Sequence, residues 1–265
     1  MVSSIGSYST AQTGNAVAFK AASATELVSD ASKNQGASGT QGGGTLTIST
    51  LASQLADSAS RAEARDKMLS RSELADKANS LLDQILGDAY QANKAKYNNE
   101  VPKTDDPELL ARAKQATEFV TSSDRGSRSV KNPFGSLSRE QLSNIIYDDS
   151  GNYTINERRA AYYESDDREQ AWRVKVAAQA MDEYNRTGKM TNFFSSVLDH
   201  FKELPTIEQA QYPKDYASDL ESKISRDFNY RTHQAEGKSE NPMNLIEMLF
   251  AQSPRRPYRT LSFSA

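Results

Sequence analysis

Cysteine is absent from the 265 residues of the sequence, and histidine occurs only twice. Without cysteine the chain has no disulfide, no thiolate metal site and no cysteine nucleophile. No apolar run approaches the roughly 18 residues that a membrane-spanning helix requires, so no transmembrane segment is expected. The stretch Met1–Thr10 lacks the cationic and apolar regions of a secretory signal peptide. The chain is therefore expected to be cytoplasmic, or to be exported by a route that needs no such signal.

An excess of charge of either sign is also missing. The sequence has 35 acidic and 32 basic residues, a formal net charge of -3, and the two signs are interspersed along most of the chain. Such a balance creates no extended basic surface for phosphates. Aromatic residues also do not alternate with Lys and Arg as they do in base-stacking surfaces. Nucleic acid is therefore not an expected partner.

Apolar periodicity is missing from residues 1–49. This segment consists mostly of Ser, Thr, Ala, Gly, Gln and Asn, and its charged residues are Lys20, Glu26, Asp30 and Lys33. Such a composition cannot bury enough apolar surface to offset the entropy of ordering the chain. We expect a disordered arm over residues 1–49.

From residue 50 onwards, apolar residues recur at the three- and four-residue steps of a helix, and strand patterns are nearly absent. Capping boxes at Ser70, Ser138 and Thr154 mark three helix starts. The predicted helices cover residues 50–69, 70–98, 106–120, 138–147, 154–186, 191–204, 216–228 and 242–251. The expected fold is all-α, an irregular helical bundle behind the disordered arm.

A polar stretch from Thr121 to Lys131 separates two groups of predicted helices. We therefore expect four parts in the chain: the arm at 1–49, a helical segment at 50–122, a helical domain at 132–252 and an irregular tail at 253–265.

The predicted helix at 154–186 carries the widest apolar face. One stripe consists of residues at four-residue steps: Trp172, Val176, Ala180 and Tyr184. Further apolar residues widen this face beyond half of the circumference. We therefore expect this helix to be the central buried element, and Ser165–Asp167 offers a site for its interruption.

The loop that precedes this helix resembles an EF-hand calcium loop. Over the twelve residues from Asp148 to Arg159, oxygen-bearing groups recur at alternate positions. These candidate calcium ligands are Asp148, Ser150, Asn152 and Thr154, the last through its backbone carbonyl.

Two positions of this loop depart from the calcium-binding pattern. Tyr153 stands where glycine permits the sharp turn, and Arg159 stands where a bidentate carboxylate should complete the ligand shell. We therefore interpret the loop as a helix–helix turn of the Asx type, with a weak calcium site as the alternative.

Each histidine begins a His-x-x-Glu pattern, with Glu203 after His200 and Glu236 after His233. This spacing can present both groups to one metal on a helix. His200, however, lies at the edge of the apolar arc of its helix and Glu203 points away from that arc. His233 lies in a polar stretch and is expected on the surface. No metal site is assigned to either histidine.

Known catalytic motifs are also missing. The sequence has no Gly-x-Ser-x-Gly turn, no phosphate-binding loop and no dinucleotide fingerprint. The acidic run of Glu164, Asp166 and Asp167 offers a carboxylate pair for acid–base hydrolysis. We favour the interpretation that these residues complement the dipole at a helix start.

The central block from Asn132 to Pro213, which includes the stretches 132–135, 145–161 and 209–213, resembles a module in uncharacterised proteins of pseudomonad-type bacteria. This resemblance covers about a third of the chain and implies no activity. The arm at 1–49 is similar in composition to the N-termini of type III or flagellar export substrates.

The hypothesis that these patterns favour is a non-enzymatic helical interaction protein with another protein as its partner, exported through the arm at 1–49. Two alternatives remain: a carboxylate-based hydrolase with a cleft between helical lobes, and a weak calcium-binding protein. The sequence leaves the oligomeric state open.

Overall fold

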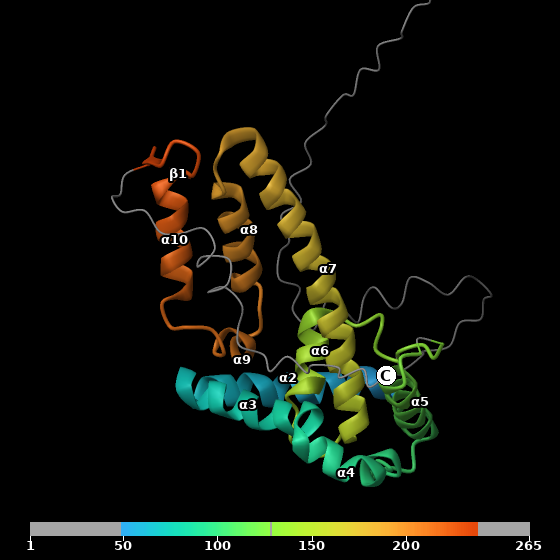
Figure 1. Cartoon of the computed structure of the whole chain (residues 1–265). Helices are drawn as coiled ribbons and strands as arrows, with labels where there is room; N and C mark the ends of the chain where they lie inside the picture. The colour runs from blue at the N-terminus through green and yellow to red at the C-terminus, as the bar shows by residue number, and fades with distance from the viewer. Residues whose placement is uncertain (1–48, 128, 238–265) are drawn as a thin grey trace, which may run out of the picture. The chain divides into compact units, whose positions relative to one another are not determined.

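The computed structural model describes residues 49–127 and 129–237, and this part of the chain is all-α apart from one short hairpin (Figure 1). The helices are α2 Thr50–Met68, α3 Arg71–Leu86, α4 Asp88–Asn98, α5 Pro107–Asp124, α6 Arg139–Ile146, α7 Ile155–Thr187, α8 Thr191–Lys202, α9 Thr206–Gln209 and α10 Tyr216–Arg226. The hairpin pairs β1 Phe228–Asn229 antiparallel with β2 Gln234–Ala235. The predicted fold class is confirmed. Within these ranges, no helix combines the length and the apolarity needed to cross a bilayer.

Three predicted elements lie wholly or almost wholly outside the described residues. They are the arm at 1–49, of which only Ser49 is described, the helix at 242–251 and the tail at 253–265. Ser49 itself is the N-cap of α2 and accepts a hydrogen bond from the amide of Ala52.

Local capping signals place the helix starts. Complete capping boxes form at Ser70 for α3, at Ser138 for α6 and at Thr154 for α7. Each box satisfies amides that the first turn of a helix leaves without partners. At the other end of α7, Gly188 adopts the left-handed conformation with φ of 78°. The starts predicted from these motifs are confirmed.

Two predicted boundaries are wrong. The helix expected over 70–98 is broken at Gly87, where the extended backbone ends α3 and α4 begins one residue later. A Cβ at Gly87 would lie only 2.8 Å from the carbonyl oxygen of Asp83, so this break requires glycine. Helix α5 continues to Asp124 rather than ending near residue 120, because Lys94 and Arg159 hold the Asp124 carboxylate in place.

Two other features were not predicted. Helix α7 runs without interruption through Ser165–Asp167, and the single turn α9 follows Pro205. The hairpin of β1 and β2 was also missed, because two-residue strands carry no periodicity.

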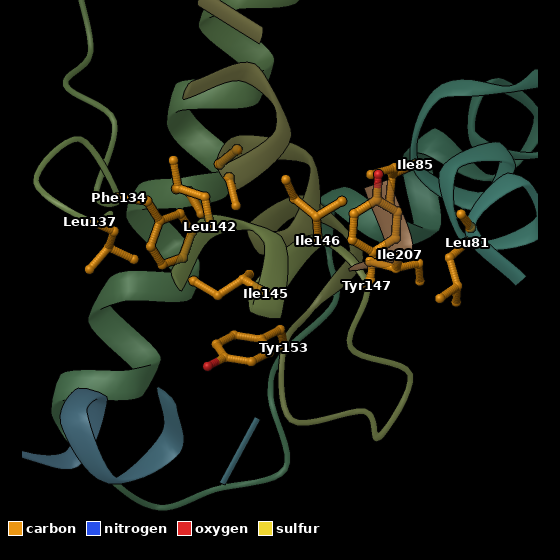
Figure 2. Close-up of a cluster of buried hydrophobic side chains, with 14 of the residues drawn as sticks. Leu81, Ile85, Phe134, Leu137, Leu142, Ile145, Ile146, Tyr147, Tyr153 and Ile207 are labelled. Carbon is orange, nitrogen blue, oxygen red and sulfur yellow. The ribbon is translucent and has the colours of Figure 1, made fainter. Parts of the chain in front are cut away.

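A first core, the N-terminal cluster, gathers side chains from α2 to α6, the first half of α7 and α9. Figure 2 shows part of it, with Leu142, Ile145 and Ile146 of α6 directed into the cluster. Phe134, Ile85 and Ile207 are fully buried there. Burial of each such side chain contributes about 1.5–3 kcal/mol to the stability of the fold.

A second core, the C-terminal cluster, gathers side chains from the second half of α7, from α8 and from α10 (Figure 1). Its buried members are Val176, Ala180, Met190, Phe193, Phe194, Val197, Leu198, Phe201, Leu204, Tyr216 and Leu220. Helix α7 is the only helix that supplies buried apolar residues to both clusters among those described.

The expectation that the Trp172 helix is the central buried element is wrong for its C-terminal half. Val174 is 72% exposed and Met181 is 63% exposed, and Trp172 itself is only partly buried. The reason lies in the packing, since α8 packs on this half of α7 while α10 packs mainly on α8. The apolar face of α7 is therefore wider than the surface that covers it.

Candidate functional site

An open groove lies along the second half of α7, between this helix and α8. Its cavity volume is about 460 Å³. Helix α7 contributes one stripe to the lining, with Trp172, Val176, Ala180 and Tyr184 one turn apart. Helix α8 contributes Phe193, Val197 and Phe201. The lining is thus mainly apolar and aromatic, as in sites that bind apolar ligands or peptide side chains.

A buried carboxylate positions the α8 wall of this groove. Helix α8 has no side-chain N-cap of its own. Instead, Glu183 of α7 accepts hydrogen bonds from the amides of Asn192, at 2.9 Å, and Phe193, at 3.0 Å. A carboxylate at a helix N-terminus satisfies free amides and complements the helix dipole. Glu183 therefore fixes the angle at which α8 returns along α7.

Aromatic rings fill one end of the groove. Phe201 lies 5.2 Å from Tyr212 and 5.1 Å from Tyr216 between ring centroids, in edge-on geometries. Arg71 donates to the backbone carbonyls of Gln209 and Tyr212, which ties this end to α3. Aromatic pairs of this kind add about 0.5–1.5 kcal/mol each beyond their buried area. These contacts hold the aromatic rings in place at this end of the groove.

Polar groups meet at the same end, around the buried carboxylate of Glu169. Glu169 accepts from His200 Nε2 at 2.9 Å, from Arg139 at 3.1 Å and from Arg173 at 3.2 Å. Arg139, at the start of α6, also donates to Glu208 at 3.1 Å. Burial would raise the pKa of Glu169, but the hydrogen bond and charge of His200, with the charges of Arg139 and Arg173, outweigh it and lower the pKa to about 2.

His200 is held between this carboxylate and the indole of Trp172. The two rings stack with centroids 3.7 Å apart and an interplanar angle of 11°. Its partner is Glu169 rather than Glu203, which is exposed at the C-cap of α8. The other histidine, His233, is exposed in the hairpin, as expected. The described chain thus brings neither His-x-x-Glu pattern together as a ligand pair, and it has no cluster of three or more His, Asp or Glu arranged to hold a metal.

The chemistry available at this end is limited by the pairing of its charges. A carboxylate with a pKa near 2 is ionised at neutral pH and is a poor proton acceptor. The acidic run proposed for hydrolysis does not line the groove. Glu164 instead pairs with Arg168 at 2.8 Å on the surface of α7. The alternative interpretation, a helix-dipole role for this run, is wrong, because α7 does not start there.

The loop predicted as a calcium site lies elsewhere, beside α2. The Asp148 carboxylate accepts from Ser58 at 2.8 Å and from Arg61 at 2.7 Å, and it also accepts from the amide and hydroxyl of Ser150. Burial opposes ionisation of Asp148, but these partners outweigh it and hold the pKa below its ordinary value. The carbonyl of Asn152 accepts from Gln54 at 2.7 Å. These oxygens are therefore used within the protein.

The remaining positions of this loop serve the N-terminal cluster. Thr154 caps α7 through its capping box with Glu157. The side chain of Tyr153 is buried, and burial raises its pKa to about 12. Arg159 is buried against the ring of Tyr90, with its guanidinium carbon 4.0 Å from the ring centroid. Arg159 therefore does not point into the loop, and calcium binding at Asp148, Ser150, Asn152 and Thr154 stays a prediction.

Two residues of this site, Glu169 in the lining of the groove and its partner Arg139, were not predicted from the sequence. One signal was present: Glu169 lies on the same helical face as Trp172 and Val176, and a carboxylate inside an apolar stripe requires a partner. Its partners Arg139 and His200 come from other helices, so no local pattern identified them.

A scan against protein-family models and searches of curated proteins and of solved structures find no match to this chain. The resemblance to the pseudomonad-type module therefore stays a prediction, and function is inferred from geometry alone.

Proposed function

We propose that this chain is a non-enzymatic helical interaction protein and that its groove binds the apolar face of a helix from another protein. The observation that carries the proposal is the open apolar groove between α7 and α8, with Met181 exposed at its margin. Exposed apolar surface joined to a shaped groove is typical of protein interaction sites.

The length of the groove suits a bound helix. Its α7 wall extends from Glu169 to Asn185, which is about 24 Å along a helix. Helix-binding grooves accept side chains at three- and four-residue steps, and methionine and aromatic residues adapt to them. The groove offers Met181, Met190 and Trp172 for such contacts.

The paired charges support a binding role over catalysis. Acid–base catalysts work best when their pKa is near the working pH. Glu169, the buried carboxylate of the groove, has a pKa of about 2 and three hydrogen-bond donors around it. This arrangement supports a structural role for Glu169, in which it fixes the end of the groove.

A matched pair of substitutions tests the proposal. Ala177 and Ala178 are adjacent and both exposed on α7, but only Ala177 lines the groove. A photo-reactive phenylalanine analogue at Met181 should crosslink to an amphipathic helix of a partner in the producing cell. Ala177→Glu places a charge in the groove and should lower this crosslinking at least tenfold, or about 1.4 kcal/mol, whereas Ala178→Glu should leave it unchanged. Equal crosslinking in both variants, or crosslinks to many unrelated surfaces, would contradict the proposal.

Export through the arm at 1–49 is a separate part of the proposal. Its support is the low charge and absent apolar periodicity of that segment. Fused to a reporter in a bacterium with a non-Sec export system, residues 1–49 should carry the reporter out of the cell. A matched fusion of residues 50–98 is the control, and equal retention of both reporters would contradict export.

A further inference from the structure

We infer that residues 242–251 of the same chain occupy the groove when no partner is bound, so that the protein regulates its own binding site. This inference rests on the groove of the proposed function. It does not depend on which protein is the partner.

The sequence of this segment suits a groove-bound helix. Asn241 is a favourable N-cap and Pro242 a favourable first helical residue. At 100° per residue, six apolar side chains lie within an arc of about 160° on the helical wheel. They are Pro242, Met243, Leu245, Ile246, Leu249 and Phe250, and a seventh, Met248, lies about 60° beyond one edge of this arc. Asn244 and Glu247 lie outside this arc, so the predicted helix has one broad apolar face.

The described chain ends beside the groove. The amide of Gly237 donates to the carbonyl of Arg226 at 2.8 Å, at the C-terminal end of α10. The hairpin is tied to the end of α7, where the amide of Tyr230 donates to the carbonyl of Gly188 at 2.8 Å and Arg231 donates to the carbonyl of Asn185. Asn185 itself lines the groove. Glu236 also pairs with Lys189, so the described chain ends near the C-terminal end of α7, where Asn185 lies.

The length of the chain beyond Gly237 matches the groove. Residues 238–241 span at most about 14 Å when extended. The predicted helix at 242–251 is about 15 Å long, and the α7 wall of the groove is about 24 Å long. A helix that begins near Asn185 can therefore lie along the wall toward Glu169. The groove is therefore long enough to cover the apolar face of this helix.

The surface of α7 beside the groove is complementary to this segment. Val174 and Met181 are large, apolar and mostly exposed, and Ala177 is exposed between them. None of these three residues carries charge, and the segment has a single charged residue, Glu247, which lies outside its apolar arc. Contact between two apolar surfaces of one chain carries no entropy cost of association between molecules.

The only tryptophan of the sequence, Trp172, lines the groove and reports its occupancy. In the full chain, the double variant Ile246→Asp with Leu249→Asp should free the groove. If the segment occupies the groove at least half of the time, quenching of Trp172 fluorescence by acrylamide should rise about twofold. Asn244→Asp adds one negative charge on the opposite side of the predicted helix and should leave quenching unchanged. Equal quenching in wild type and double variant would overturn the inference.

A peptide of residues 240–252 supplies the second measurement. Added to the double variant, it should restore the wild-type quenching in a saturable way, and the Ile246→Asp/Leu249→Asp peptide should not. Quenching of the wild type should not depend on protein concentration. If quenching of the wild type depends strongly on protein concentration, the segment binds the groove of a second copy, and the inference that it binds the groove of its own chain is overturned.

The two proposals can fail separately. If the segment occupies the groove, the double variant should bind the crosslinked partner more tightly than the wild type does, because binding no longer requires displacement. If the partner binds the wild type and the double variant with equal affinity, the inference is contradicted and the proposed function stands. If the double variant changes the quenching but Ala177→Glu lowers the crosslinking of no partner, the inference stands and the proposed function is contradicted.

Discussion

Helix α7 passes through two cores that differ in how completely they cover it. In its first half Ala160 and Ala161 are fully buried, because α3, α5 and α6 all pack on this helix. In its second half Val174 and Met181 are largely exposed, because α8 is the one helix of the described residues that packs closely there. The number of neighbouring helices, and not the apolar content of a helix, decides how much of its face is buried.

The two cores also use buried charge differently. In the N-terminal cluster Arg159 is a core side chain, packed on Tyr90 and paired with Asp124 at 3.0 Å. In the C-terminal cluster Glu169 and its cations lie at the end of an open groove. The buried charge of Arg159 thus completes the packing of a closed core. The charges around Glu169 instead balance one another at the end of an open groove.

The largest expected difference between the two cores is in the effect of aromatic truncation. Phe134→Ala removes a fully buried ring from the N-terminal cluster and should lower the free energy of unfolding by about 3–5 kcal/mol. Trp172→Ala removes a partly buried ring from the groove and should cost only about 1–2 kcal/mol, since part of the indole is already in contact with water. Urea unfolding of the full chain measures both. Equal losses would mean that the groove is as closed as the N-terminal cluster.

A smaller effect is expected from the carboxylate at the end of the groove. The pKa of Glu169 is lowered from 4.5 to about 2, so its contribution is fully present above pH 4.5 and is lost as the pH falls toward 2. At pH 6, Glu169→Gln should reduce the free energy of unfolding by roughly 2 kcal/mol. The difference between the two proteins should shrink by pH 3.

The matched control for this titration is Glu164→Gln, on the same helix. Glu164 forms an exposed pair with Arg168, and such pairs contribute about 0–1 kcal/mol. A difference between wild type and Glu169→Gln that is as large at pH 3 as at pH 6 would contradict the role assigned to the Glu169 charge.

Two glycines with positive φ, one before α7 and one at its C-terminal end, allow the backbone constraints at the two ends of this helix to be compared. Gly188 closes α7 with φ of 78°, and a Cβ there would lie 2.5 Å from the amide oxygen of Asn229. Gly151 has φ of 83° in the loop before α7, and a Cβ there would meet nothing within 4 Å. Gly151→Ala should cost about 1 kcal/mol from backbone strain alone, and Gly188→Ala about 1–2 kcal/mol because it adds a clash. In thermal unfolding, the melting temperature should fall further for Gly188→Ala than for Gly151→Ala. The reverse order would show that the Asn229 side chain moves away from the added Cβ at no cost in stability.

Local chemistry made the helix starts predictable. The capping boxes at Ser70, Ser138 and Thr154 depend on residues three apart, so the sequence alone contains them. The all-α fold class follows from the same local periodicity. The end of α5 at Asp124 was not predictable in this way, because its partners Lys94 and Arg159 are distant in sequence.

Tertiary packing explains the remaining errors. The stripe from Trp172 to Tyr184 is correctly apolar, but its exposure depends on how many helices pack against it. The site around Glu169 depends on Arg139 and His200, from α6 and α8, and sequence spacing cannot show that these helices meet. In the loop at 148–159, Arg159 departs from the calcium pattern because it belongs to the N-terminal cluster.

The smallest effect is expected from calcium at that loop. To bind there, the ion would have to displace Arg61 and Ser58 from the Asp148 carboxylate, and Arg159 supplies no replacement ligand. Millimolar calcium should therefore leave the melting temperature unchanged and give no saturable heat in calorimetry. Even a calcium concentration equal to Kd would stabilise the fold by about 0.4 kcal/mol, which a careful melting series detects. Magnesium at equal ionic strength is the control. A shift of the melting temperature with calcium but not with magnesium would show that the loop can leave the N-terminal cluster. The N-terminal cluster would then not be the closed core that its comparison with the open groove requires.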